Sequence, residues 1–144
     1  MNNYEKRDRY ATLNEKLDKA LDNEFYYEAI FIEHAILEDR VESLLRHANI
    51  TYPKKTMLGA KITYIMTEKI FKDEYVSKHI DGTLIKEIRD WKEMRNDLVH
   101  DLINCPYEDD EVKEVALVGK TVIRRFASKT TLVNNHIDKI LQEV

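Results

Sequence analysis

The chain has 144 residues, of which 43% are hydrophobic and 35% charged, and its formal net charge is −4. This length predicts one domain, residues 1–144, and the apolar content excludes an intrinsically disordered chain. Only three glycines and two prolines are present. Because sheets need frequent turns, this scarcity favours an all-α protein built from long helices. The single cysteine, Cys105, excludes an internal disulfide and a multi-cysteine zinc site.

The acidic balance gives no general basic footprint for nucleic acid, although a local RNA site remains open. The stretch from Met1 to Lys6 contains no apolar core, so it does not resemble a signal peptide. No run approaches the 18 apolar residues that a membrane span requires. We therefore expect a cytoplasmic protein that does not enter the membrane.

The first two predicted helices span Tyr4–Leu21 and Phe25–Ala48, separated by Asp22-Asn23, which can end one helix and cap the next. The second helix is apolar on more than one side. This pattern is typical of a central helix or of one that faces a second subunit. The helix also carries several charged residues, most of which we expect in solvent: Glu33, His34, Glu38, Asp39 and Glu42.

A predicted loop at 49–56 precedes a third helix at Met57–Phe71, with Thr56 as its N-cap. Residues 72–82 are polar and end in an Asp81-Gly82 turn. A fourth helix is predicted from Thr83 to about Leu102, before a break at Asn104-Cys105-Pro106.

From Glu108 almost to the end, apolar residues recur at helical spacing, including Val112, Phe126 and Ile137. The pattern predicts one long helix, with a break allowed at Ser128–Thr131 because serine and threonine favour caps over helix interiors. The prediction is thus an all-α bundle of four to five helices.

Arg95 lies on the apolar stripe of the fourth helix, between Trp91 and Leu98, where an apolar residue is expected. His100 follows five residues later, which places it roughly 140° around the helix axis from Arg95. The two side chains are therefore not neighbours on one ideal helix. Either the long arginine stem wraps around the helix, or a second subunit supplies the missing group across a two-fold axis.

The stretch from Arg95 to His100 (Arg-Asn-Asp-Leu-Val-His) resembles the Arg-x4–6-His motif of the HEPN superfamily (higher eukaryotes and prokaryotes nucleotide-binding). Asn96 supplies the polar residue that the family prefers after the arginine. The resemblance implies a four- to five-helix bundle that dimerises and joins two motifs in one cleft. Many members are metal-independent endoribonucleases of toxin–antitoxin and phage-defence systems. One toxin branch has tyrosine two residues after the histidine, and here that position is Leu102, so the resemblance does not extend to that branch.

The resemblance implies that Arg95, Asn96 and His100 are catalytic, without cofactor or metal, and that RNA is the substrate. The residue chemistry suits this role. An imidazole titrates near neutral pH and can move a proton. A guanidinium binds phosphate oxygens and keeps its charge. A homodimer is expected, with an antitoxin or other regulatory protein as a further partner.

Three alternatives remain open. The chain can be a non-catalytic HEPN-like module that binds a nucleotide or protein or serves as an assembly scaffold, or a small helical regulator without this chemistry. At the level of residues, Arg95 can instead pair with Glu38 or Glu42 while His100 is solvated. For His34 with Glu38 one turn on, we favour a surface pair over a metal site, and for Lys54-Lys55 and Arg124-Arg125 we favour solvated faces over phosphate contacts.

Overall fold

The structure is a computed structural model and describes residues 2–100, 102 and 109–143. Those residues form helices and contain no strand, so the all-α class is confirmed. None of the described helices is long and apolar enough to cross a membrane. The elements are α1 (Asn3–Asp22), α2 (Tyr26–His47), α3 (Leu58–Thr67), the 3-10 helix η1 (Lys69–Lys72), α4 (Glu74–His79), α5 (Gly82–His100) and α6 (Asp109–Gln142).

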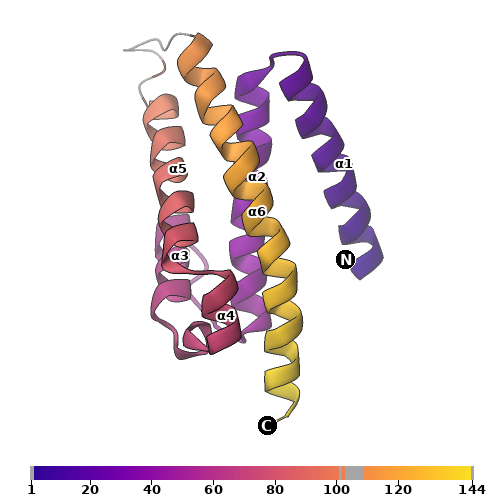
Figure 1. The fold of residues 1–144 in the computed structure, drawn as a ribbon, viewed down its shortest axis with the longest axis vertical. Helices are drawn as coiled ribbons and strands as arrows, with labels where there is room; N and C mark the ends of the chain where they lie inside the picture. The colour runs from indigo at the N-terminus through magenta and orange to yellow at the C-terminus, as the bar shows by residue number, and fades with distance from the viewer. Residues whose placement is uncertain (1, 101, 103–108, 144) are drawn as a thin grey trace.

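The long helix α6 runs along the molecule and packs against α2, α5 and α4 (Figure 1). Helix α1 packs on α2, and α3 packs against α2 and α5. Helix α2 thus contacts α1, α3 and α6, which confirms the central position that its wide apolar surface predicted. Large side chains from α2, α3, α5 and α6 are fully buried in one core, including Leu37, Leu44, Ile62, Ile88, Trp91, Phe126 and Ile137.

Helix α6 continues without a break through Ser128–Thr131. The hydroxyls of Thr130 and Thr131 donate to backbone carbonyls four residues earlier, at 2.9 and 3.4 Å. Phe126 and Val133 on either side are fully buried. Because apolar packing continues across the polar run, tertiary contacts outweigh the capping preference of these side chains.

The third predicted helix is too long, because α3 ends at Thr67 and Phe71 lies in η1, where it is buried. The polar connection after it holds the unpredicted helix α4, whose N-cap Asp73 accepts hydrogen bonds from two backbone amides. Thr56 does not cap α3, since its hydroxyl donates to the Pro53 carbonyl at 2.6 Å. Short helices leave too few turns for an apolar period to mark them.

Glu33 on α2 departs furthest from prediction. Its side chain is 0% exposed, whereas the sequence favoured a solvated carboxylate. Neither carboxylate oxygen has a hydrogen-bond partner among the described residues. The other predicted surface carboxylates of α2, Glu38, Asp39 and Glu42, remain partly exposed.

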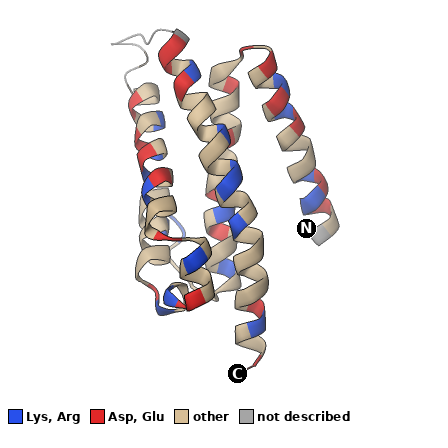
Figure 2. Cartoon of the chain, in the orientation of Figure 1, with Lys and Arg blue, Asp and Glu red and all other residues tan. Residues whose placement is uncertain are grey.

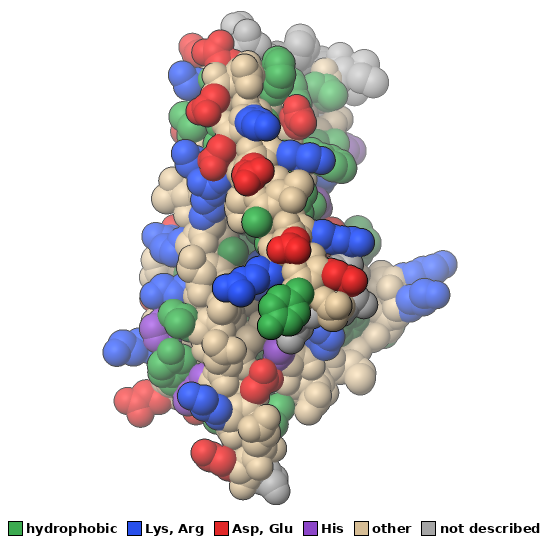
Figure 3. All heavy atoms as spheres, turned by 90° about the vertical axis from the view of Figure 1, so that its right-hand side faces the viewer, with side chains coloured by type: hydrophobic (Ala, Val, Ile, Leu, Met, Phe, Trp, Pro, Cys, Tyr) green, Lys and Arg blue, Asp and Glu red, His purple; other side chains and the backbone are tan. Residues whose placement is uncertain are grey.

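Both acidic and basic residues occur on each of the long helices, so none of these helices carries charge of one sign (Figure 2). The face shown in Figure 3 likewise carries both signs side by side. The Arg124-Arg125 pair is engaged in ion pairs, Arg124 with Asp18 and Arg125 with Glu87, rather than being free for phosphate. The predicted break at 104–106, with the Cys105 thiol, lies outside the described residues.

Candidate functional site

Helix α5 positions the predicted site. The Asp81 side chain accepts a hydrogen bond from the Leu84 amide at 2.8 Å and caps the first turn. The Trp91 indole is fully buried and its N–H donates to the Val115 carbonyl of α6 at 3.0 Å. With Leu98 also buried, the last two turns of α5 are anchored to the core. The rest of those turns, including residues 95 and 96, is therefore held in a fixed orientation.

Arg95 is half-buried, and its guanidinium donates to the Asn96 side-chain oxygen at 3.2 Å. Among the described residues, no carboxylate forms an ion pair with it. Glu42 pairs with Lys61 at 2.6 Å, and Glu38 lies 3.7 Å from His34. The alternative in which Glu38 or Glu42 neutralises Arg95 is therefore not observed. The guanidinium keeps its charge available for an anion.

His100 is the last residue of α5 and is exposed. It forms no hydrogen bond or ion pair with Arg95 or Asn96 within the described part of the chain. Because α5 is helical throughout the motif, the two catalytic candidates stand roughly 140° apart around one axis. One chain therefore brings Arg95 and Asn96 together and leaves His100 apart from them.

A second histidine, His34 of α2, is instead close enough to Arg95 for the charge of Arg95 to affect its pKa. Burial lowers the pKa of His34, and the nearby positive charges of Arg95 and Lys92 lower it further against the opposing effect of Glu38. The predicted contact with Glu38 is present, but the ring is largely buried and its Nδ1 has no partner among the described residues. Sequence reasoning missed this neighbourhood because only the packing of α2 near α5 creates it.

Lys92 adds a second cation to the same place. Its side chain is 15% exposed and its Nζ lies 2.8 Å from Glu93. A methyl group at Gly59, at the start of α3, would stand 3.7 Å from that Nζ. Helices α2, α3 and α5 therefore meet here around two cations and an imidazole that favours its neutral form. Such a set can hold an anionic group next to a proton acceptor.

Exposed apolar side chains accompany this cluster. Phe31 precedes His34 by one turn on the same face of α2 and is 72% exposed. Val99 follows Arg95 by one turn on α5 and is 50% exposed. Apolar groups next to a charged site are typical of a surface that another molecule covers.

The residues of the described ranges contain no group of three or more His, Cys, Asp or Glu side chains placed to hold a metal ion. Comparison of the chain with protein-family models, with curated protein sequences and with solved structures gives no match. The interpretation of the site therefore rests on the residues and their geometry.

Burial is the main cause of the lowered pKa of His34, and the charge of Arg95 is expected to lower it further. In Arg95→Gln the pKa of His34 rises towards its ordinary value, because one of the charges that disfavour the imidazolium is gone. NMR titration of the His34 ring measures this shift. Arg125→Gln, a matched change on α6 at an arginine paired with Glu87, leaves the His34 titration unchanged. An unaltered pKa in Arg95→Gln would show that the two side chains are not electrostatically coupled.

Proposed function

We propose that this chain is a metal-independent endoribonuclease of HEPN type, with a composite site formed by Arg95, Asn96 and His100 at a homodimer interface. The observation that carries the proposal is the half-buried guanidinium of Arg95. Its one hydrogen-bond partner among the described side chains is the Asn96 side-chain oxygen, which leaves its positive charge without an acidic partner and supports binding of a phosphate.

Each of the three residues has a separate role in the proposed RNA cleavage. The 2′-hydroxyl of the RNA attacks the adjacent phosphorus, and the bond from phosphorus to the 5′-oxygen breaks, leaving a 2′,3′-cyclic phosphate and a 5′-hydroxyl. Arg95 neutralises the charge that grows on the phosphoryl oxygens. His100 of the second subunit takes the proton of the 2′-hydroxyl, and the leaving 5′-oxygen takes its proton from solvent. Asn96 orients the phosphate or the imidazole.

The exposed apolar groups near the motif support a dimer in this region. Phe31 and Val99 are large and solvent-exposed in one chain, and their burial against a second copy would be favourable. A two-fold contact at this end of α5 would bring the partner's His100 towards Arg95. We propose a toxin or phage-defence role, with an antitoxin or other regulatory protein that controls the enzyme.

The second candidate function is a non-catalytic HEPN-like module that binds a nucleotide or a protein. The separation of His100 from Arg95 within one chain favours it, because a binding site for an anion needs Arg95 but not His100.

The deciding experiment is RNA cleavage by the purified chain in the presence of EDTA. Wild-type protein is expected to cleave total RNA, and His100→Ala is expected to lose about 10²–10⁴-fold in rate. Arg95→Gln is expected to lose about 10²–10³-fold, since one stabilising contact to the developing charge disappears. Arg125→Gln is the matched control and retains activity. A folded wild-type protein that is as inert as both variants would favour the binding module.

A further inference from the structure

A polar cavity of about 510 Å³ lies between α1, α2 and α6. On α2 it is lined by Arg40, Ser43, Arg46 and His47. Ser43 follows His34 by nine residues, which places it roughly 180° around the helix axis from that residue. The cavity therefore opens on the opposite side of α2 from the Arg95 site, and the proposed ribonuclease chemistry does not use it. We call it the α1–α2–α6 cleft.

Positive charge is concentrated in the α1–α2–α6 cleft. Lys6 and Arg7 of α1 face Arg40 and Arg46 of α2 across it. Burial lowers the pKa of Lys6, and Asp39 opposes this, while the positive charges of Arg46 and Arg40 lower it further. These cations are therefore close enough to repel one another. A bound anion would relieve this repulsion.

The acidic groups beside the cleft, Asp39 and Asp138, do not balance these cations, and Asp138 lies 2.8 Å from the lining residue His47. Asp39 is shared, lying 3.5 Å from Lys6 and 2.8 Å from Arg40, and it also accepts a hydrogen bond from Tyr10. Within the described ranges, Arg7 and Arg46 form no ion pair. An excess of positive charge therefore remains, on residues that already face a cavity.

Neutral polar groups form the floor of the cleft. Ser128, Thr131 and Asn135 repeat along one face of α6, so part of the run that suggested a helix break lines this cavity. Asn134 is 6% exposed and its side-chain nitrogen donates to Ser43 at 3.0 Å. Its oxygen is buried without a partner in the described structure. This oxygen can accept a hydrogen bond from a hydroxyl or amine of a ligand.

We infer that the α1–α2–α6 cleft binds a small phosphate-bearing molecule with at least two negative charges and a hydroxyl or amine group. Guanidinium groups bind phosphate oxygens in a bidentate manner, and two of them here lack an acidic partner. The cavity volume falls within the range of small-molecule sites, about 300–1,000 Å³. The face in Figure 3 carries acidic side chains among its basic ones.

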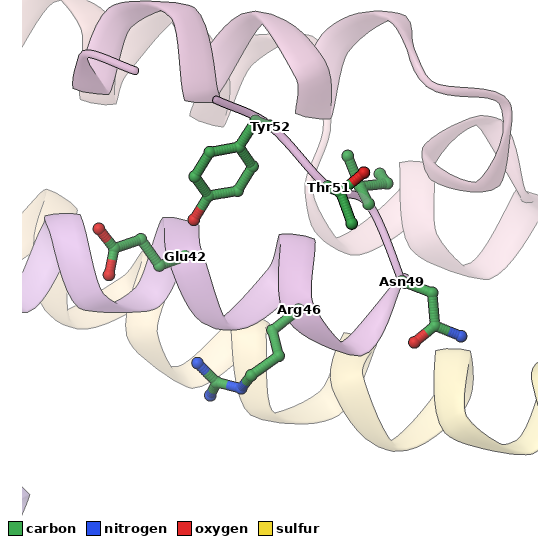
Figure 4. A pocket seen from close by; sticks show the side chains of 6 residues that line it. Glu42, Arg46, Asn49, Thr51 and Tyr52 are labelled. Atoms are coloured by element: carbon green, nitrogen blue, oxygen red, sulfur yellow. The ribbon is translucent and has the colours of Figure 1, made fainter. Parts of the chain in front are cut away.

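A neighbouring hollow of about 480 Å³ shares Arg46 but lacks these properties. There the Arg46 guanidinium points away from the Tyr52 ring (Figure 4). Glu42 is neutralised by Lys61, whose ammonium also lies 5.3 Å from the centre of the Tyr52 ring. The charge of Arg46 is thus directed to the α1–α2–α6 cleft rather than to the hollow at Tyr52.

Isothermal titration with pyrophosphate and with ADP, at low salt so that charge contacts are not screened, tests the inference. Both probes are expected to bind saturably at one site per chain. Arg46→Gln and Arg7→Gln are each expected to weaken binding by about tenfold, the loss of one charged hydrogen bond. These two side chains are exposed, so both variants are expected to fold, and thermal melting without ligand checks this. Arg125→Gln is the matched control and binds as the wild type does.

Three outcomes would overturn the inference. The first is no saturable binding of either probe at millimolar concentration. The second is an equal loss of affinity in Arg125→Gln, which would indicate non-specific charge. The third is displacement of pyrophosphate by a single-stranded RNA oligonucleotide through Arg46, which would make the cleft an RNA surface. None of these readouts depends on RNA cleavage, so this inference and the proposed ribonuclease can fail separately.

Discussion

A mixture of the Arg95→Gln and His100→Ala variants is expected to regain RNA cleavage that neither variant shows alone. If Arg95 of one subunit acts with His100 of the other, each dimer has two sites. In a mixed dimer one site has both residues intact and the other has both replaced. Random exchange makes half of the dimers mixed, so about a quarter of the wild-type sites return. A gel-based cleavage assay before and after subunit exchange measures this gain against a background reduced at least about 10²-fold.

The controls separate a composite site from a recovery of stability. Mixing either variant with the double variant Arg95→Gln/His100→Ala restores nothing, because no combination of subunits then holds an intact pair. A mixture that stays inert although the dimers exchange would place the whole site within one chain. A stable monomer at micromolar concentration in light scattering would contradict the interface itself.

In one chain the structure brings Arg95 near His34, whereas the sequence motif joins Arg95 to His100. The first pair depends on packing between helices, and the second depends on spacing along one helix. Spacing along α5 predicted Arg95 on the apolar stripe and apart from His100, and the structure leaves Arg95 half-buried there, since helical periodicity fixes both positions. His34 is 61 residues earlier in the sequence, and its approach to Arg95 depends on how α2 and α5 both pack on α6. No local pattern contains that information.

The same limit explains which parts of the fold were predictable. The long helices α2 and α6 bury stripes of apolar residues over many turns, so their period identifies them. The two-turn helix α4 depends on a cap by Asp73 and on packing against α6, which its own six residues do not specify. In α2, charge pattern alone makes Glu33 resemble its solvated neighbours. Its burial follows from a glycine on a different helix, as the contacts of its carboxyl group show.

The Glu33 carboxyl lies against α6 where Gly119 leaves room for it. A methyl group added at Gly119 would stand 2.2 Å from a Glu33 carboxylate oxygen and 2.7 Å from the Trp91 indole nitrogen. The space that any larger residue would fill is therefore taken by the carboxyl group. Burial raises the pKa of Glu33 to about 9, and the positive charge of Arg124 opposes this only in part. The folded protein thus holds this carboxyl protonated at neutral pH.

Glu33→Gln is therefore expected to remove a large decline in stability with rising pH. Between the ordinary glutamate pKa and about 9, the folded state binds a proton that the unfolded state has lost. The free energy of unfolding then falls by up to about 1.4 kcal/mol for each pH unit. Glutamine has no proton to lose and nearly the same shape. The free energy of unfolding of the variant, relative to that of the wild type, should therefore rise by up to about 4 kcal/mol between pH 5 and pH 8.

Urea unfolding followed by circular dichroism at several pH values measures the difference between wild type and variant, so that other titrating groups cancel. Glu28→Gln, on the exposed side of the same helix, is the matched control and should leave the wild-type slope unchanged. Equal slopes for the wild type and Glu33→Gln would mean that ionised Glu33 is solvated or paired in the folded protein. If the decline of the free energy of unfolding with pH is lost only in Glu33→Gln, then α2, α5 and α6 pack around a neutral carboxyl group. Alkaline pH would then loosen the core that anchors α5 and its Arg95.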